Sequence, residues 1–110
     1  MKSWFATLVE VFNVVKNSEK ALTQKDLWFH DPDVNSEDEN LLISRRGIDN
    51  GAIVNASTSE PIYQFSQKDM KNRQVIFRHS GALYAGEQFS ALMVCFIIHI
   101  YWVIRSDDGP

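Results

Sequence analysis

The chain has 110 residues, a length that fits one domain with a modest core and leaves no room for a second. Hydrophobic residues make up 45% and charged residues 23% of the sequence, close to the average of folded soluble domains. The net charge of −3, with Arg45-Arg46 as the basic cluster, argues against a general nucleic-acid-binding protein, because phosphate contacts need clustered lysine and arginine.

Residues 4–15 are mostly apolar and fit either a strand or a helix. Their valines favour a strand, the leucine and phenylalanine also allow a helix, and periodicity alone does not separate the two. The first residues begin like a signal peptide, but Glu10 and Asn13 interrupt the apolar stretch and no small-residue cleavage site follows. We therefore treat residues 1–13 as an N-terminal segment whose role the sequence does not define.

A capped turn and a proline stop follow in residues 22–33. Thr23 is placed to cap a short helical turn over residues 24–27. The strand-like residues 28–30 then run into Asp31-Pro32-Asp33, where the proline ends regular structure. Residues 33–40 are strongly acidic, which predicts a surface loop.

Short strands separated by turn residues are predicted for the middle of the chain. The candidates are residues 41–43, 52–54, 62–65 and 75–79, and glycine, asparagine and proline separate them. A spacing of roughly 10 residues between short strands is typical of an antiparallel β-sandwich and not of a βαβ fold.

A second turn, over residues 66–69, repeats the form of the first. LTQKDL (22–27) and FSQKDM (65–70) share the order apolar, hydroxyl, Gln, Lys, Asp, apolar. A hydroxyl residue three positions before an acid caps a short turn, and flanking apolar residues attach it to the core. We expect both segments to be short helical turns, with Leu27 and Met70 packed inward.

Residues 89–104 are the most apolar part of the chain. The apolar run of residues 91–104, which contains His99, is shorter than the roughly 20 residues that a membrane-spanning helix needs. Its β-branched and aromatic residues suit a buried strand or strand pair, with a membrane-associated segment or an aberrant sequence as the alternatives. The single cysteine, Cys95, rules out a disulfide within the chain and is expected to be a small buried side chain.

The motifs in this order resemble the chondroitin sulfate proteoglycan repeat, which occurs in the Fras/Frem family of extracellular matrix proteins and in chondroitin sulfate proteoglycan core proteins. The resemblance covers about residues 14–81, from LTQKDLWFHDPD to FSQKDMKNRQVIFRHSG. Beyond Glu87 the apolar run replaces the strand and turn with which the family pattern continues. The family features fall on Thr23, Asp26, Leu27, Asp31, Pro32, Asp33, Gly51, Phe65, Ser66, Gln67, Asp69, Val75, Phe77, His79 and Gly81.

The resemblance implies an all-β, cadherin-like antiparallel β-sandwich with short helical turns. It assigns residues 14–90 to an incomplete or divergent repeat, followed by an apolar strand-like run and polar tail in residues 91–110. It also implies a non-enzymatic adhesion module, extracellular or on the cell surface, within a longer chain of a basement-membrane protein. Its implied partners are matrix proteins or adjacent repeats, without a nucleic acid or a membrane.

Two candidate sites lie in the predicted loops. Asp31 and Asp33 offer the hard oxygen ligands that Ca²⁺ prefers, with solvated acidic surface as the alternative, and calcium is the one cofactor we consider. Asn55-Ala56-Ser57 is an N-glycosylation sequon in a predicted turn, so Asn55 is a glycan site if the chain is secreted.

The sequence predicts no catalytic residues. His30, His79 and His99 are scattered and no nucleophile motif accompanies them. Two rival interpretations of function stay open at this point. One is a small intracellular enzyme or regulator whose capping boxes only mimic the family, and the other is a membrane-associated fragment held by residues 91–104.

Overall fold

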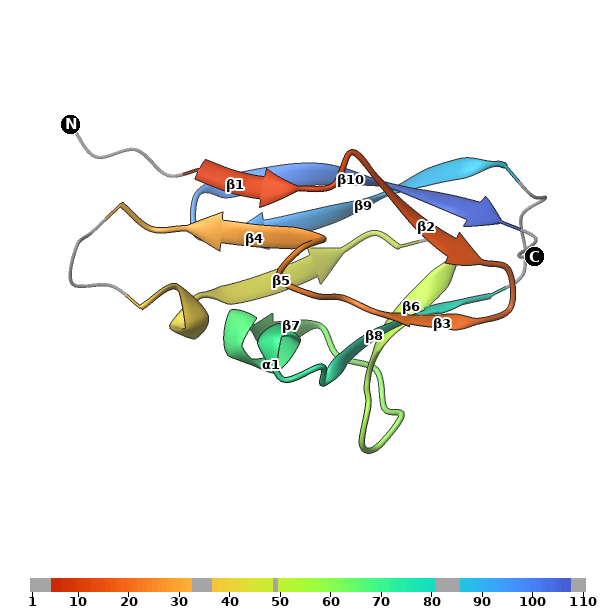
Figure 1. The fold of residues 1–110 in the computed structure, drawn as a ribbon, viewed down its shortest axis with the longest axis horizontal. Helices are drawn as coiled ribbons and strands as arrows, with labels where there is room; N and C mark the ends of the chain where they lie inside the picture. Colours follow the sequence, from red (N-terminus) through yellow and green to blue (C-terminus); the bar gives the residue numbers. More distant parts are fainter. Residues whose placement is uncertain (1–4, 33–36, 49, 81–85, 108–110) are drawn as a thin grey trace.

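Ten strands, one short α-helix and one 3-10 turn form the described part of the protein (Figure 1). The computed structural model describes residues 5–32, 37–48, 50–80 and 86–107. The elements, in chain order, are β1 (Phe5–Leu8), β2 (Val11–Val15), β3 (Glu19–Ala21), β4 (Leu27–His30), η1 (Asp38–Asn40), β5 (Leu42–Arg46), β6 (Gly51–Asn55), β7 (Gln64–Ser66), α1 (Gln67–Lys71), β8 (Val75–His79), β9 (Gln88–Cys95) and β10 (Ile98–Asp107).

The strands form two layers. The larger layer is a five-stranded sheet in the order β2-β10-β9-β5-β7, in which β2 runs parallel to β10 and the other neighbours are antiparallel. The second layer contains the three-stranded sheet β3-β8-β6 and the pair β1-β4. The first turn joins these two smaller sheets, since it connects β3 to β4 (Figure 1).

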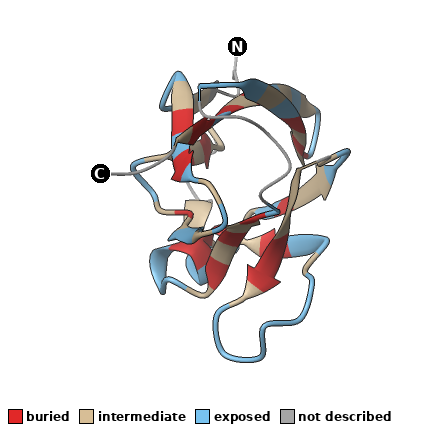
Figure 2. Cartoon of the chain, turned by 90° about the vertical axis from the view of Figure 1, so that its right-hand side faces the viewer, coloured by how far each residue is buried: buried red, intermediate tan, exposed pale blue. Residues whose placement is uncertain are grey.

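The core lies between the layers and is centred on three aromatic rings. Phe12 of β2 lies 4.7 Å from Trp102 of β10 and 6.2 Å from Phe77 of β8, measured between ring centroids. Buried and partly exposed residues alternate along β8, as a strand with one covered face requires. Figure 2 shows the buried positions of the curled sheets, coloured red, around a common interior.

The predicted β-sandwich is confirmed, and the two ambiguous apolar segments are strands. Residues 4–15 contain β1 and β2, and residues 89–104 form an antiparallel hairpin of β9 and β10 joined by Phe96 and Ile97. Residues 41–48 and 50–65 contain no helix, as the sandwich requires. Among the described residues, no helix is long and apolar enough to cross a membrane.

The core draws on both ends of the chain. Phe12 lies in the segment that the sequence interpretation set apart as residues 1–13, and Trp102 lies in the segment 91–110. Their rings contact each other at an interplanar angle of 35° because β2 and β10 are hydrogen-bonded neighbours. The sandwich therefore extends over the described residues from β1 to β10 and is not confined to residues 14–90.

Gly51 belongs to a strand and not to the turn residues that separate the predicted strands of residues 41–43 and 52–54. It is the first residue of β6 and lies opposite His79 of β8. A Cβ atom at this position would lie 2.5 Å from the Phe77 ring and 2.6 Å from the Arg78 carbonyl oxygen. The close approach of β6 to β8 therefore requires glycine here.

Candidate functional site

Hydrogen bonds between Thr23 and Asp26 hold the first motif turn. The Asp26 carboxylate accepts hydrogen bonds from the Thr23 backbone N–H (3.0 Å) and hydroxyl (2.9 Å). The Leu27 N–H donates to the Thr23 carbonyl oxygen (3.3 Å), so residues 23–27 form one helical turn. Leu27 is fully buried, which confirms the predicted inward packing.

The second motif turn is a capped helix. The Ser66 side chain accepts from the Asp69 N–H (3.1 Å) and the Asp69 carboxylate accepts from the Ser66 N–H (3.1 Å), which completes a capping box. Met70 is fully buried, as predicted, and Phe65 is nearly so. The two similar sequences therefore both form turns in which the aspartate carboxylate accepts from the backbone N–H three residues earlier, but only the second has a full capping box.

The glutamines of the two similar motifs, Gln24 and Gln67, have different roles. Gln67 is fully buried, and its amide accepts from the Phe29 N–H (2.6 Å) and donates to the carbonyl oxygens of Phe29 (2.9 Å) and Asp38 (2.8 Å). Gln24 is exposed and lines two surface cavities. Gln67 thus joins α1 to β4 and η1, whereas Gln24 is available to a ligand.

Asp38, in the acidic segment of residues 33–40, is hydrogen-bonded to the end of β4. The Asp38 carboxylate lies 2.7 Å from Nδ1 of His30 and accepts from the Asp31 N–H at 3.0 Å. Asp31 and Pro32 are partly buried, while Asp33, the other proposed calcium ligand, lies outside the described residues. Among the residues that are described, no group of three His, Cys, Asp or Glu side chains is arranged to hold a metal ion.

The sequon lies at the end of β6 in an exposed turn. The Asn55 side-chain oxygen accepts from the N–H groups of Ser57 (2.8 Å) and Thr58 (3.1 Å), and residues 56–60 are exposed. The acceptor asparagine is therefore on the surface, but its side-chain oxygen is already bonded within the turn.

The three histidines occupy separate strands. His30 on β4 bonds Asp38, His79 on β8 is buried beside the Phe89 ring, and His99 on β10 is exposed. Burial, and to a smaller extent Lys16, lowers the pKa of His79. Protonation of this ring therefore opposes folding as the pH falls below the usual histidine pKa. Gly81, the last motif position, lies outside the described residues.

Cys95 is buried in β9, and its thiol is expected to react only when the chain unfolds. Burial, with the nearby charges of Asp31 and Asp38, raises its pKa to about 11. At pH 8 the thiolate is then roughly 100-fold or more scarcer than in an unfolded chain with the usual thiol pKa. We expect 5,5′-dithiobis(2-nitrobenzoate) to label the native protein at least about 100-fold more slowly than the urea-unfolded protein. Equal labelling rates would contradict the buried position of the thiol.

The outer surface of the larger sheet is also apolar, a feature that the sequence interpretation missed. In β9 and β10 the core-facing residues, such as Met93 and Trp102, alternate with outward-facing residues. Of these, Leu92, Val94, Tyr101 and Val103 are apolar, and Gln88, Ser90, His99 and Arg105 are polar. Tyr101 lies opposite Leu92, and Val103 lies opposite Val11 of β2, so these apolar side chains are neighbours, bordered by His99 opposite Val94 and by Ser90 opposite Val103. We call Val11, Leu92, Val94, Tyr101 and Val103 the outer apolar face.

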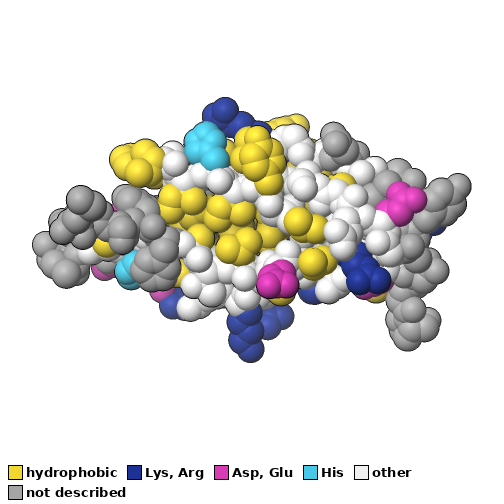
Figure 3. Space-filling view, turned by 90° about the horizontal axis from the view of Figure 1, so that it is seen from above, with side chains coloured by type: hydrophobic (Ala, Val, Ile, Leu, Met, Phe, Trp, Pro, Cys, Tyr) yellow, Lys and Arg dark blue, Asp and Glu magenta, His cyan; other side chains and the backbone are white. Residues whose placement is uncertain are grey.

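The outer apolar face is unusual for a sheet in contact with water. An antiparallel sheet usually alternates apolar residues toward the core with polar residues toward solvent, and contiguous apolar surface marks an interaction site. Tyr101 is 73% exposed. Figure 3 looks onto the edge of the molecule where β1 and β10 lie, and it shows hydrophobic side chains there with a histidine and Lys or Arg side chains at their border. The signal in the sequence was the run of residues 91–104, which is apolar at odd and even positions alike.

Comparison with known proteins agrees with this architecture. A family model described as "Cadherin-like" matches residues 6–93. The protein named chondroitin sulfate proteoglycan 4 is 38% identical to this chain over 77 residues in Rattus norvegicus and Mus musculus, and 36% identical in Homo sapiens. The match covers 69% of this chain but only 3% of each relative. No solved structure matches the chain at a significant level. The chain thus belongs to the cadherin-like family, and it is a repeat of the chondroitin sulfate proteoglycan type.

Proposed function

We propose that the chain is an extracellular or cell-surface adhesion module within a longer protein, and that it binds matrix proteins or neighbouring repeats. The observation that carries this proposal is the outer apolar face on the larger sheet. Family membership supports a binding module over an enzyme, because cadherin-like sandwiches present surfaces, and a fold by itself assigns no chemistry. The Fras/Frem and basement-membrane assignments stay predictions of the resemblance.

The outer apolar face lies along the side of the molecule, parallel to its longest axis, and not at either end of that axis. The molecule measures 44 Å along its longest axis, and β1 begins at one end of this axis while β10 ends near the other (Figure 1). Neighbouring repeats in one chain would therefore attach at opposite ends of the sandwich. A face along the side stays accessible to a separate protein, and this is why we assign it to a matrix protein.

Binding to purified matrix proteins tests the proposal. The recombinant chain is immobilised, and binding of several collagens, laminin and fibronectin is measured by biolayer interferometry. We expect at least one of them to bind, and we expect Leu92→Ser/Tyr101→Ser to weaken that binding about tenfold or more, because aromatic and aliphatic anchors dominate interfaces.

The matched control removes an apolar side chain from the opposite outer surface. Ile76 on β8 is partly exposed between the buried Val75 and Phe77, so Ile76→Ser changes the outer surface of the smaller sheet. We expect this variant to bind like the wild type. The proposal fails if no matrix protein binds, or if both variants weaken binding equally.

Calcium binding by Asp31 and Asp33 is a further part of the proposal. Acidic side chains that gather in one loop repel each other, and a bound cation relieves the repulsion. We expect millimolar Ca²⁺ to raise the melting temperature of the wild type by mass action. We expect it to raise the melting temperature of Asp31→Asn/Asp33→Asn much less. Melting curves that are identical with Ca²⁺ and with chelator would show that the calcium site does not exist.

Glycosylation of Asn55 likewise stays a prediction, which treatment of the secreted protein with an N-glycosidase checks.

A further inference from the structure

Two neighbouring surface cavities flank the first motif turn, and their charges are complementary to those of one kind of ligand. The first cavity has a volume of about 540 Å³ and lies between the first turn and α1. The second has a volume of about 550 Å³ and extends toward η1. Both are in the range of small-molecule sites. The first is lined by Thr23, Gln24, Lys25, Met70, Lys71 and Arg73, and the second by Gln24, Trp28, Glu37, Asp38, Glu39 and Lys71.

The first cavity gathers cations that the fold does not use. Within the described part of the chain, the side chains of Lys25 and Arg73 make no hydrogen bond or ion pair, although both are exposed at the same cavity. The nearby acids are engaged elsewhere, since the Asp26 carboxylate is bonded to Thr23 and the Asp69 carboxylate is bonded to Ser66. Clustered cations without a structural partner form a binding site for an anionic group.

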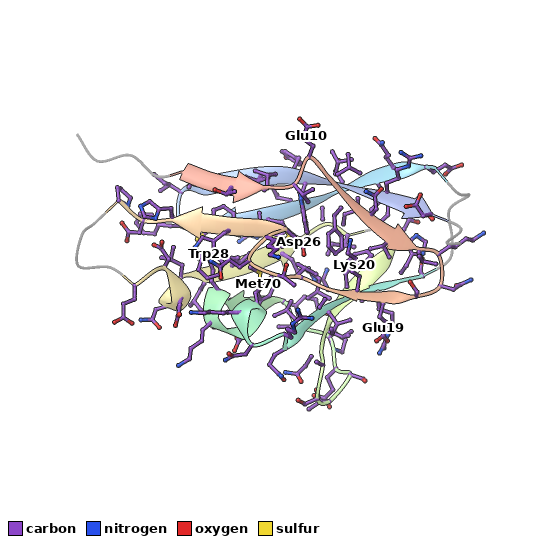
Figure 4. The ribbon with its side chains drawn as sticks, viewed as in Figure 1. Glu10, Glu19, Lys20, Asp26, Trp28 and Met70 are labelled. Carbon is purple, nitrogen blue, oxygen red and sulfur yellow. The ribbon has the colours of Figure 1, made fainter. Side chains whose placement is uncertain are left out.

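The second cavity combines carboxylates with an aromatic ring. Glu39 is paired with Lys71, which lowers the pKa of Glu39, and the Glu37 carboxylate accepts from the Asn40 amide at 3.3 Å. Trp28 on β4 is partly exposed, and Figure 4 shows it between the strand and α1, near Met70. Carboxylates accept from hydroxyl groups, and an indole ring packs against the apolar face of a sugar.

Gln24 and Lys71 line both cavities, so one ligand can occupy the two together. Its end in the first cavity must be anionic, and its continuation in the second must be neutral and rich in hydroxyl groups. An extended polyanion such as a nucleic acid does not fit, because the carboxylates of the second cavity and the net charge of −3 repel it.

We propose that these joined cavities bind a sulfated oligosaccharide, with a sulfate group held by Lys25 and Arg73 and the adjoining sugar ring on Trp28. The site lies on the two motif turns and not on the outer apolar face, so it stands independently of the proposed matrix-protein surface. The Gln24 amide, between the two cavities, is placed to bond both the sulfate and the ring hydroxyls.

Calorimetric titration of the purified chain with an otherwise uncharged hexasaccharide that carries one sulfate group at its end, and with the same hexasaccharide without the sulfate, tests this site. We expect the sulfated sugar to bind at least about tenfold more tightly, because charge-assisted hydrogen bonds to a sulfate are lost on desulfation. Lys25→Ala/Arg73→Asn is expected to weaken the sulfated sugar about tenfold or more. Asparagine is chosen at position 73 because Arg73 has a φ of 59°, a conformation that asparagine tolerates.

A charge-matched variant separates the site from general electrostatic attraction. Lys16→Ala/Arg46→Asn removes the same charge from residues outside both cavities, and we expect it to bind within about twofold of the wild type. We also expect the sulfated sugar to change the fluorescence of the wild type but not of Trp28→Phe. Equal weakening by the two double variants, equal binding of the desulfated sugar, or tighter binding of a phosphopeptide probe would overturn the proposal. Absence of any heat with the sulfated sugar at millimolar concentration would overturn it as well.

Discussion

Replacing Gln67 by alanine is expected to destabilise the protein by about 3–5 kcal/mol, because three hydrogen bonds from a fully buried amide are lost together. The Phe29 N–H would lose its partner in the core, and the carbonyl oxygens of Phe29 and Asp38 would lose a donor. A buried polar group without a partner costs more than a net hydrogen bond contributes, so the losses exceed those of three surface bonds. The attachment of α1 to β4 and η1 would loosen at the same time.

The first of the two similar motifs supplies a matched control for Gln67. Gln24 occupies the same position of the first turn but is exposed, so Gln24→Ala should change the free energy of unfolding by less than about 0.5 kcal/mol. Urea denaturation of both variants measures the difference. A conservative change, Gln67→Glu, keeps the shape but turns a donor into an acceptor beside two carbonyl oxygens, and should also be clearly destabilising at pH 7. If Gln67→Ala and Gln24→Ala were equally stable, Gln67 would not join α1 to β4 as described.

Replacing Trp102 by alanine is expected to cost about 3–5 kcal/mol, the usual range for a large aromatic residue lost from a core. Trp102 is 1% exposed, its ring lies 4.7 Å from Phe12, and its indole N–H donates to the Val9 carbonyl oxygen at 3.2 Å. Small domains are stable by about 5–15 kcal/mol, so this change alone removes a large part of the total. It also leaves a cavity where β2, β10 and the smaller sheet meet.

Two further variants keep the Trp102 prediction testable if Trp102→Ala does not fold. Trp102→Phe retains a stacked ring but loses the bond to Val9, and should cost about 1–2 kcal/mol. Tyr101→Ala changes the neighbouring residue on the outer apolar face and should have little effect on folding. Denaturation midpoints in urea rank the variants. The prediction is contradicted if Trp102→Phe is as stable as the wild type while Tyr101→Ala is strongly destabilised. That result would mean that Tyr101, and not Trp102, faces the core.

Local features of this fold could be predicted from the sequence because their physical causes are local. The strand β8 was predicted from residue 75 to residue 79, since its apolar residues alternate and a turn precedes it. Both capped turns followed from a hydroxyl residue three positions before an acid. Leu27 and Met70, the apolar residues that end these turns, were correctly placed in the core.

Features that depend on residues far apart in the chain could not be predicted. The parallel pairing of β2 with β10 joins residues about 90 positions apart, and no local pattern specifies it. For the same reason, residues 4–15 could be read as helix or strand until their partner strand was known. The buried role of Gln67 depends on Phe29 and Asp38, so its contrast with Gln24 is absent from two nearly identical motifs.

The candidate surfaces were only partly accessible to sequence reasoning. The apolar run of residues 91–104 suggested burial, but the outer apolar face emerges only when β9 and β10 pair and their alternate residues align with β2. The joined cavities bring together Lys25 of the first turn and Arg73 beyond α1, which are separated by more than 40 positions in the sequence. Charge counts over the whole chain conceal such a local cluster, because the net charge is negative.

The location of the module outside the cell is the central claim, and labelling of intact cells tests it most directly. Cells that express the longer protein carrying this module are treated with a membrane-impermeant amine-reactive biotin, and labelled lysines are identified by mass spectrometry. Lys25 and Lys68 are exposed and, within the described part of the chain, their side chains make no ion pair, so both should react readily. We predict biotin on Lys25 and Lys68 in intact cells. Labelling of these lysines only after the cells are lysed would place the module inside the cell and contradict the account.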